Sequence, residues 1–83
     1  MRSFNDVRNL LADTLALGER GLAMGPETPL LGSLPELDSM AVVQLIAALE
    51  EYYDFRVDDD EISADAFATL GSLVDFVDGK LMR

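Results

Sequence analysis

The 83-residue sequence contains no cysteine and no histidine. Without cysteine the chain forms no disulfide and has no thiolate nucleophile, and without histidine it has no imidazole base. The two commonest zinc-ligand types are both missing, so no metal site is expected. The sequence therefore gives no support to a self-sufficient enzyme.

Basic residues are scarce, because 6 Lys and Arg stand against 16 Asp and Glu, for a net charge of −10. Nucleic acids and anionic membranes bind proteins through Lys and Arg, so neither is an expected partner. The acids gather in residues 36–65, which contain ten of them and a single base, Arg56. This concentration favours partners with basic surfaces, although an acidic mimic of nucleic acid would share it.

Long apolar runs are also missing. No run approaches the roughly 20 residues that a membrane-spanning helix needs, and no secretory signal follows Met1. The cytoplasm is the expected compartment. With 83 residues, 49% of them hydrophobic, the chain has enough material for one folded domain, placed at residues 1–83.

The best-defined predicted element is a helix over residues 38–53. Asp38 or Ser39 can cap its start with a side-chain oxygen, and no Gly or Pro interrupts the rest. One broad apolar face is predicted to enter the core: Ala41, Val42, Leu45, Ala48, Leu49 and Tyr52. The side that Ser39 occupies begins apolar and ends acidic: Met40, Val43, Ile46 and Ala47, then Glu50 and Glu51. This side suggests a docking surface, whereas Val43 and Ile46 are alternatively core residues of a helix buried on two sides.

Before this helix, apolar residues at helical spacing predict a first helix over residues 3–17, capped by Ser3 with Asp6 at its third position. Residues 18–37 hold four Gly and three Pro, so they are predicted to form a long connection. Its predicted anchors on the bundle are apolar: Leu22, Met24, Leu30, Leu31 and Leu34.

After it, a short third helix is predicted around Ile62, Ala66 and Phe67, behind an acidic run. The run is no calcium loop, because residue 59 is Asp where an EF-hand needs Gly. Thr69 is predicted to cap a last helix, whose outward-facing residues are Asp75, Asp78 and Lys80. The predicted fold is all-α, a small four-helix bundle with three longer helices, one short helix and a long loop between helices 1 and 2.

The start of the central helix resembles the attachment site of acyl carrier proteins. Leu37-Asp38-Ser39-Met40 is similar to the family pattern Asp-Ser-Leu at a helix start. An Asp-Ser pair alone is usually an ordinary cap, so the resemblance also rests on chain length, acidity and the helix pattern over residues 4–81. Met40 stands where Leu is usual. Ala41 and Gln44 replace acids that are frequent in fatty-acid carriers, which weakens the case for ordinary fatty-acid synthesis.

The resemblance implies that Ser39 carries a covalent 4′-phosphopantetheine, transferred from coenzyme A by a separate phosphopantetheinyl transferase. Asp38 would orient Ser39 and contact the transferase's magnesium ion. The thiol of the arm would carry acyl groups as thioesters between enzymes with basic docking surfaces: an acyl-activating ligase, a synthase or a transferase. The chain would be a monomeric carrier and not a catalyst. The implied partner-recognition residues are Met40, Val43, Ala47, Glu50, Glu51, Asp58, Asp59, Asp60 and Glu61.

Residues 31–40 also resemble freestanding carriers that occur with acyl-activating ligases in bacterial polysaccharide or exosortase gene clusters. An alternative remains open. The chain would then be an unmodified acidic helical interaction module, acting as an inhibitor or a nucleic-acid mimic, with Asp38-Ser39 as a plain cap. Clustering of the acids at the serine helix favours the carrier, because a mimic would spread its charge over several faces.

Overall fold

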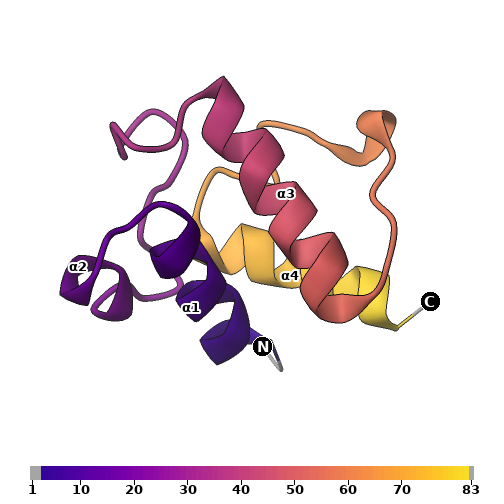
Figure 1. Ribbon diagram of the computed structural model, residues 1–83, viewed down its shortest axis with the longest axis horizontal. Helices are drawn as coiled ribbons and strands as arrows, with labels where there is room; N and C mark the ends of the chain where they lie inside the picture. Colours follow the sequence, from indigo (N-terminus) through magenta and orange to yellow (C-terminus); the bar gives the residue numbers. More distant parts are fainter. Residues whose placement is uncertain (1–2, 83) are drawn as a thin grey trace.

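The computed structural model describes residues 3–82, except for the side chain of Asp59, and it is helical (Figure 1). The elements in chain order are α1 (Phe4–Thr14), α2 (Glu19–Leu22), α3 (Ser39–Tyr53), the 3-10 helix η1 (Asp59–Glu61) and α4 (Leu70–Leu81). The described residues form no β-strand, only an isolated bridge between Pro29 and Thr69. The predicted all-α class and the central helix are confirmed. The short α-helix, however, lies before α3 instead of after it.

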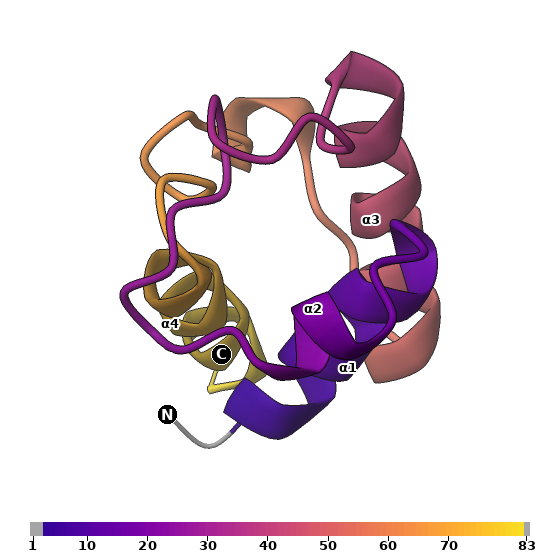
Figure 2. The same ribbon diagram turned by 90° about the vertical axis from the view of Figure 1, so that its left-hand side faces the viewer.

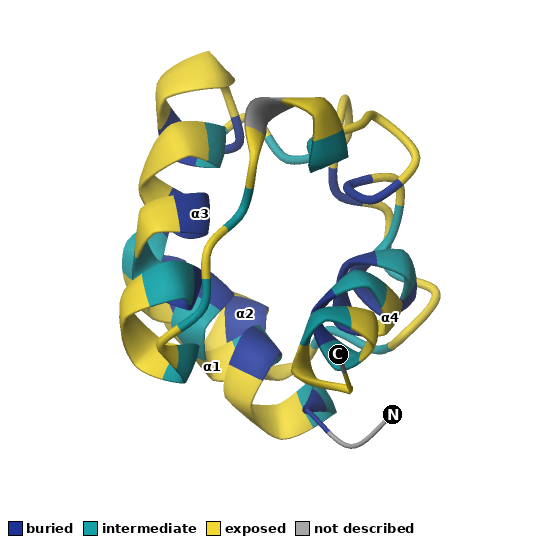
Figure 3. Ribbon diagram, turned by 90° about the vertical axis from the view of Figure 1, so that its right-hand side faces the viewer, coloured by how far each residue is buried: buried dark blue, intermediate teal, exposed yellow. Residues whose placement is uncertain are grey.

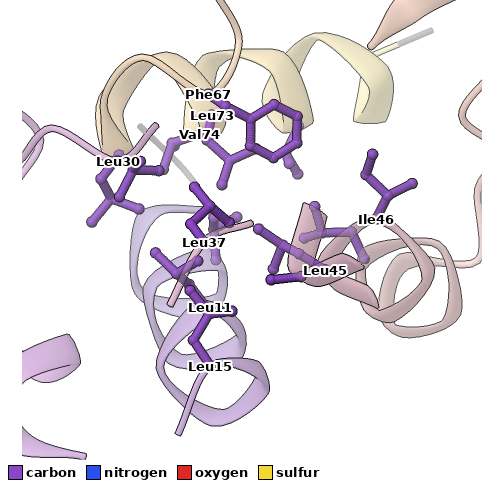
Figure 4. Packing of buried hydrophobic residues seen from close by; sticks show 14 of the residues in the cluster. Leu11, Leu15, Leu30, Leu37, Leu45, Ile46, Phe67, Leu73 and Val74 are labelled. Carbon is purple, nitrogen blue, oxygen red and sulfur yellow. The ribbon is translucent and has the colours of Figure 1, made fainter. Parts of the chain in front are cut away.

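The three longer helices α1, α3 and α4 surround one apolar core (Figures 2 and 4). Leu11 of α1, Leu45 of α3 and Leu73 of α4 are each fully buried there. The long connection contributes Leu30 and Leu37 to the same cluster, with exposures of 0% and 5%. A loop that adds its own leucines to the core is fixed by the same apolar burial that holds the helices together.

Backbone hydrogen bonds tie the connection to the segment before α4. The Leu30 N–H donates to the Ala68 carbonyl and the Leu31 N–H to the Phe67 carbonyl, both at 3.0 Å, while the Leu70 N–H donates to the Thr28 carbonyl at 2.9 Å. Leu30 is therefore an anchor, as predicted. The prediction was wrong for Leu31 and for Leu22, whose exposures are 43% and 52%.

The face of α3 that enters the core differs from the predicted one at Tyr52, and it includes Ile46, whose burial the sequence left open (Figure 3). Ile46 is buried with Ala41, Leu45 and Leu49. Tyr52 was predicted to lie in the core, but it is 55% exposed. Tyr53 instead packs partly against the core cluster, because it lies four residues after Leu49 on the same face of the helix.

The first helix is shorter than predicted and is not capped as predicted. It ends at Thr14, and Ala16 has a φ of 55°, which no α-helix accommodates. Ser3 stands at the N-cap position, but its hydroxyl donates to Asp78 Oδ1 on α4 at 2.5 Å and makes no cap bond. The Ser3–Asp6 cap was therefore wrong, and Ser3 joins the two ends of the chain.

The region after α3 also differs from the prediction. Residues 64–67 form turns, not a helix, and the Ser63 hydroxyl accepts the Ala66 N–H at 3.3 Å. Such a side-chain bond competes with continuation of a helix. The Thr69 cap of α4 is confirmed, since its hydroxyl and that of Ser72 each accept the other's backbone N–H at 3.0 Å.

Candidate functional site

Ser39 is the first residue of α3, and its side chain is exposed. The residue before it, Asp38, has an extended backbone and accepts the Ala41 N–H on Oδ1 at 2.8 Å. This bond satisfies one of the backbone N–H groups that every helix start leaves without an intrahelical partner. Asp38 is thus the cap, and the Ser39 hydroxyl remains available to solvent.

The loop that presents Ser39 is fixed from both sides. Leu37 is 5% exposed and enters the core two residues before the serine. Glu36 forms a two-point ion pair with Arg20 of α2, with N–O distances of 2.9 and 3.2 Å. The hydrogen bond between Arg20 and Glu36 lowers the pKa of the Glu36 carboxyl and raises the pKa of the Arg20 guanidinium. Arg20 was not predicted from the sequence, because the two partners are 16 residues apart and no local pattern links them.

The start of α3 suits an attached phosphodiester. Within residues 3–82, the N–H groups of Ser39 and Met40 have no acceptor, so they point their partial positive charge out of the 15-residue helix. A hollow of about 460 Å³ adjoins the serine and is lined by Leu31, Leu37, Asp38, Ser39 and Val42. The residues present therefore fit a group that combines an anionic phosphate with a partly apolar chain.

Three apolar side chains that follow the serine on α3 are open to solvent. Met40 is 67% exposed and Val43 is 63% exposed, and Ala47 is also exposed. Val43 and Ala47 also line a second hollow of about 310 Å³ between α3 and the segment that follows it, whose other lining residues are Val42, Ile46, Glu50, Val57 and Ile62. Val43 is thus a surface residue and Ile46 a core residue, which separates the two readings left open by the sequence.

The predicted recognition acids fall into two groups. Glu51, Asp58 and Asp60 are exposed, and the side chain of Asp59 lies outside the described residues. Glu50 and Glu61 have contacts inside the molecule. A Glu50 carboxylate oxygen accepts the Val57 N–H at 2.8 Å.

Glu61 receives Lys80 Nζ on both carboxylate oxygens at 2.9 Å. Lys80 had been predicted to face solvent. Its side chain is only 9% exposed, because it lies against Glu61 and the Phe55 ring. The sequence missed this contact, which joins residues 19 positions apart.

No group of three or more potential metal ligands occurs among the described residues. No helix in that part of the chain has the length and apolarity to cross a membrane. The site combines a serine beside its helix cap, a loop joined to α2 by an ion pair, and a surface of apolar and acidic residues on α3 and the segment that follows it.

Comparison with known proteins agrees with this site. The family model described as "Phosphopantetheine attachment site" matches residues 5–77. The chain is 31% identical over 74 residues to an acyl carrier protein from Clostridium perfringens, covering 89% of this chain and 91% of that one. It is 44% identical over 41 residues to an acyl carrier protein from Sulfurovum, covering 49% and 52% of the two chains.

A solution structure of a holo acyl carrier protein from Nitrosomonas europaea is also similar, with 59% identity, a TM-score of 0.93 and complete coverage of both chains. The fold and the site thus define a small helical carrier. The chain belongs to the phosphopantetheine attachment site family. It is an acyl carrier and not a catalyst, and its prosthetic group is a covalently attached phosphopantetheine.

Proposed function

We propose that Ser39 is the residue to which phosphopantetheine is attached. The observation that carries this proposal is an exposed hydroxyl at the start of a long helix whose cap is supplied by the neighbouring Asp38. The Ser39 oxygen forms the new bond to phosphorus, the pyrophosphate bond of coenzyme A breaks, and adenosine 3′,5′-bisphosphate leaves. A separate transferase supplies the base and the metal ion for this step, so Ser39 needs no activating neighbour.

Once attached, the arm supplies a thiol that holds acyl groups as thioesters. Asp38 keeps the helix start ordered, and the adjacent N–H groups of Ser39 and Met40 stabilise the phosphodiester charge. Because the chain contains no cysteine, the arm brings the only thiol on the molecule. Acyl groups are thereby directed to one position.

The partners that this surface fits have basic docking sites. Met40, Val43 and Ala47 offer an apolar contact beside Ser39, while Glu51, Asp58 and Asp60 offer exposed negative charge. Contacts of this kind form fast, are sensitive to salt and release readily, which suits a carrier that visits several enzymes. The expected partners are the phosphopantetheinyl transferase and an acyl-activating ligase, synthase or transferase. The cytoplasm as compartment and the polysaccharide or exosortase type of gene cluster stay predictions of the sequence.

The test is the intact mass of the protein after incubation with coenzyme A and a broad-specificity phosphopantetheinyl transferase. We expect a gain of one phosphopantetheine, together with one new titratable thiol. Ser39→Ala should abolish both, whereas Ser33→Ala, at an exposed serine in the loop before α3, should leave both unchanged. If the folded protein gained no mass, the proposal would be contradicted, and Ser39 would be only the first residue of α3 with no attached group. The alternative of an unmodified acidic module has no support in the family match.

A further inference from the structure

Residues 55–62, which we call the strap, follow the end of α3, run along the face between α3 and α4, and include η1 (Figures 1 and 3). One end of the strap is held to α3 by Glu50. The Glu50 carboxylate accepts the Val57 N–H at 2.8 Å, and its backbone carbonyl accepts the Phe55 N–H at 3.3 Å.

The other end of the strap is held to α4 by an ion pair. Both carboxylate oxygens of Glu61 lie 2.9 Å from Lys80 Nζ, and one of them also accepts the Asp58 N–H at 3.2 Å. The exposed fractions of the Lys80 and Glu61 side chains are 9% and 18%. Lys80 Nζ also lies 5.9 Å from the centre of the Phe55 ring. The ammonium group is therefore covered by the strap that it holds.

The carboxylates that anchor the strap belong to the same acidic surface that a basic partner would contact. Glu61 follows the exposed Asp58 and Asp60, so a partner that meets these acids also comes close to Glu61. The Glu61 carboxylate, which Lys80 binds within the molecule, is thus also within reach of an Arg or Lys of a docking partner.

We propose that a basic partner docks by displacing Lys80 from Glu61, and that this exchange releases the strap from α4. This inference rests on the proposed function, because it assumes that docking uses these acids. An arginine is the fitting competitor, since its guanidinium binds a carboxylate at two points and is less strongly hydrated than an ammonium group. Docking and strap opening are then coupled. By linkage, the factor by which docking favours strap opening equals the factor by which an open strap strengthens docking, as long as Glu61 itself is kept.

Hydrogen exchange of backbone amides tests the coupling first. In Lys80→Met, the amides of Asp58 and Glu61 should exchange about tenfold faster than in the wild type, while those of α1 should not change. Lys80→Arg, which keeps the positive charge, should stay close to the wild type. Adding the phosphopantetheinyl transferase to the wild-type protein should accelerate exchange of the same two amides. Unchanged exchange in the wild-type complex would overturn the proposal.

The KM of this transferase for the carrier provides a second test. Lys80→Met should lower the KM about fivefold, the lower end of a typical coupling between sites. Arg8→Met on α1 makes the same change in net charge and should alter the KM by less than about twofold. Equal KM values for the two variants, with normal modification, would overturn the inference alone. A complete absence of modification would overturn the proposed function with it.

Discussion

Gly21 of α2 lies so close to α1 that a Cβ atom at position 21 would overlap the Cβ of Ala12 and stand 3.0 Å from its Cα. The contact seats the four-residue α2 against α1. Arg20, which directly precedes Gly21, donates a hydrogen bond to Glu36 in the loop before Ser39. Gly21 thus allows α2 to pack where Arg20 can reach the loop before Ser39, although the sequence predicted only a break in helical structure at this glycine.

Gly21→Ala should therefore destabilise the protein by about 1–3 kcal/mol, because the new methyl group has no space and backbone must move. Urea unfolding followed by circular dichroism measures this. Gly79→Ala on α4 is the matched control, since a Cβ there meets nothing within 4 Å. That variant should be neutral or stabilised by up to about 1 kcal/mol. Equal effects of the two substitutions would disprove the close contact.

The two roles given to Asp38 can be separated by substitution. Asp38→Ala removes the acceptor of the Ala41 N–H and should cost about 1 kcal/mol of stability. Asp38→Asn keeps a capping oxygen, so its stability should stay near that of the wild type. Its rate of modification should still fall, because the resemblance to acyl carrier proteins implies that the negative charge of Asp38 contacts the transferase's magnesium ion, and this charge is lost. Wild-type modification of the Asn variant would leave Asp38 as a cap alone.

Glu50 and Glu51 are neighbours with different expected roles. Glu50→Ala should cost about 1 kcal/mol, because the Val57 N–H loses its carboxylate partner, whereas Glu50→Gln keeps an acceptor oxygen and should cost less. Glu51→Ala, at an exposed position, should not change stability but should slow association with a basic partner at low salt. Thermal unfolding and stopped-flow binding distinguish the two. If Glu50→Ala were as stable as Glu51→Ala, the strap would not depend on Glu50.

Tyr53 should make stability depend on pH in the alkaline range. Burial, and then the negative charge of Asp6, raise its pKa from 10.0 to about 12. Between these values the unfolded chain has released the phenol proton and the folded chain still holds it, so stability falls as the pH rises from about 10 to about 12. In Tyr53→Phe, the loss of stability between about pH 10 and about pH 12 should be smaller than in the wild type. Unfolding measured at several pH values in this range would detect the difference.

At neutral pH the same substitution has a second expected effect. The buried Tyr53 hydroxyl lies close to Ser3, but the Ser3 hydroxyl already donates to Asp78, and Tyr53 makes no hydrogen bond of good geometry among the described residues. Its removal should therefore leave the protein as stable as before or more stable by up to about 1 kcal/mol. A clear loss of stability at neutral pH would show that the hydroxyl makes a bond that matters to the fold.

The sequence by itself determined the features that depend on neighbours along one helix. Asp38 caps α3 and Thr69 caps α4 because a short polar side chain bonds an amide three residues away. The motif at Ser39 and the apolar core face of α3 up to Leu49 follow from the same local spacing.

Tertiary structure alone decided the features that join distant segments. The partners Arg20–Glu36, Glu61–Lys80 and Ser3–Asp78 are 16, 19 and 75 residues apart in the chain. Each bond exists only because packing of the core brings two elements together, and helical periodicity carries no record of it. For the same reason the sequence placed Lys80 in solvent and Tyr52 in the core. The fold instead places Lys80 beneath the strap and turns Tyr52 outward.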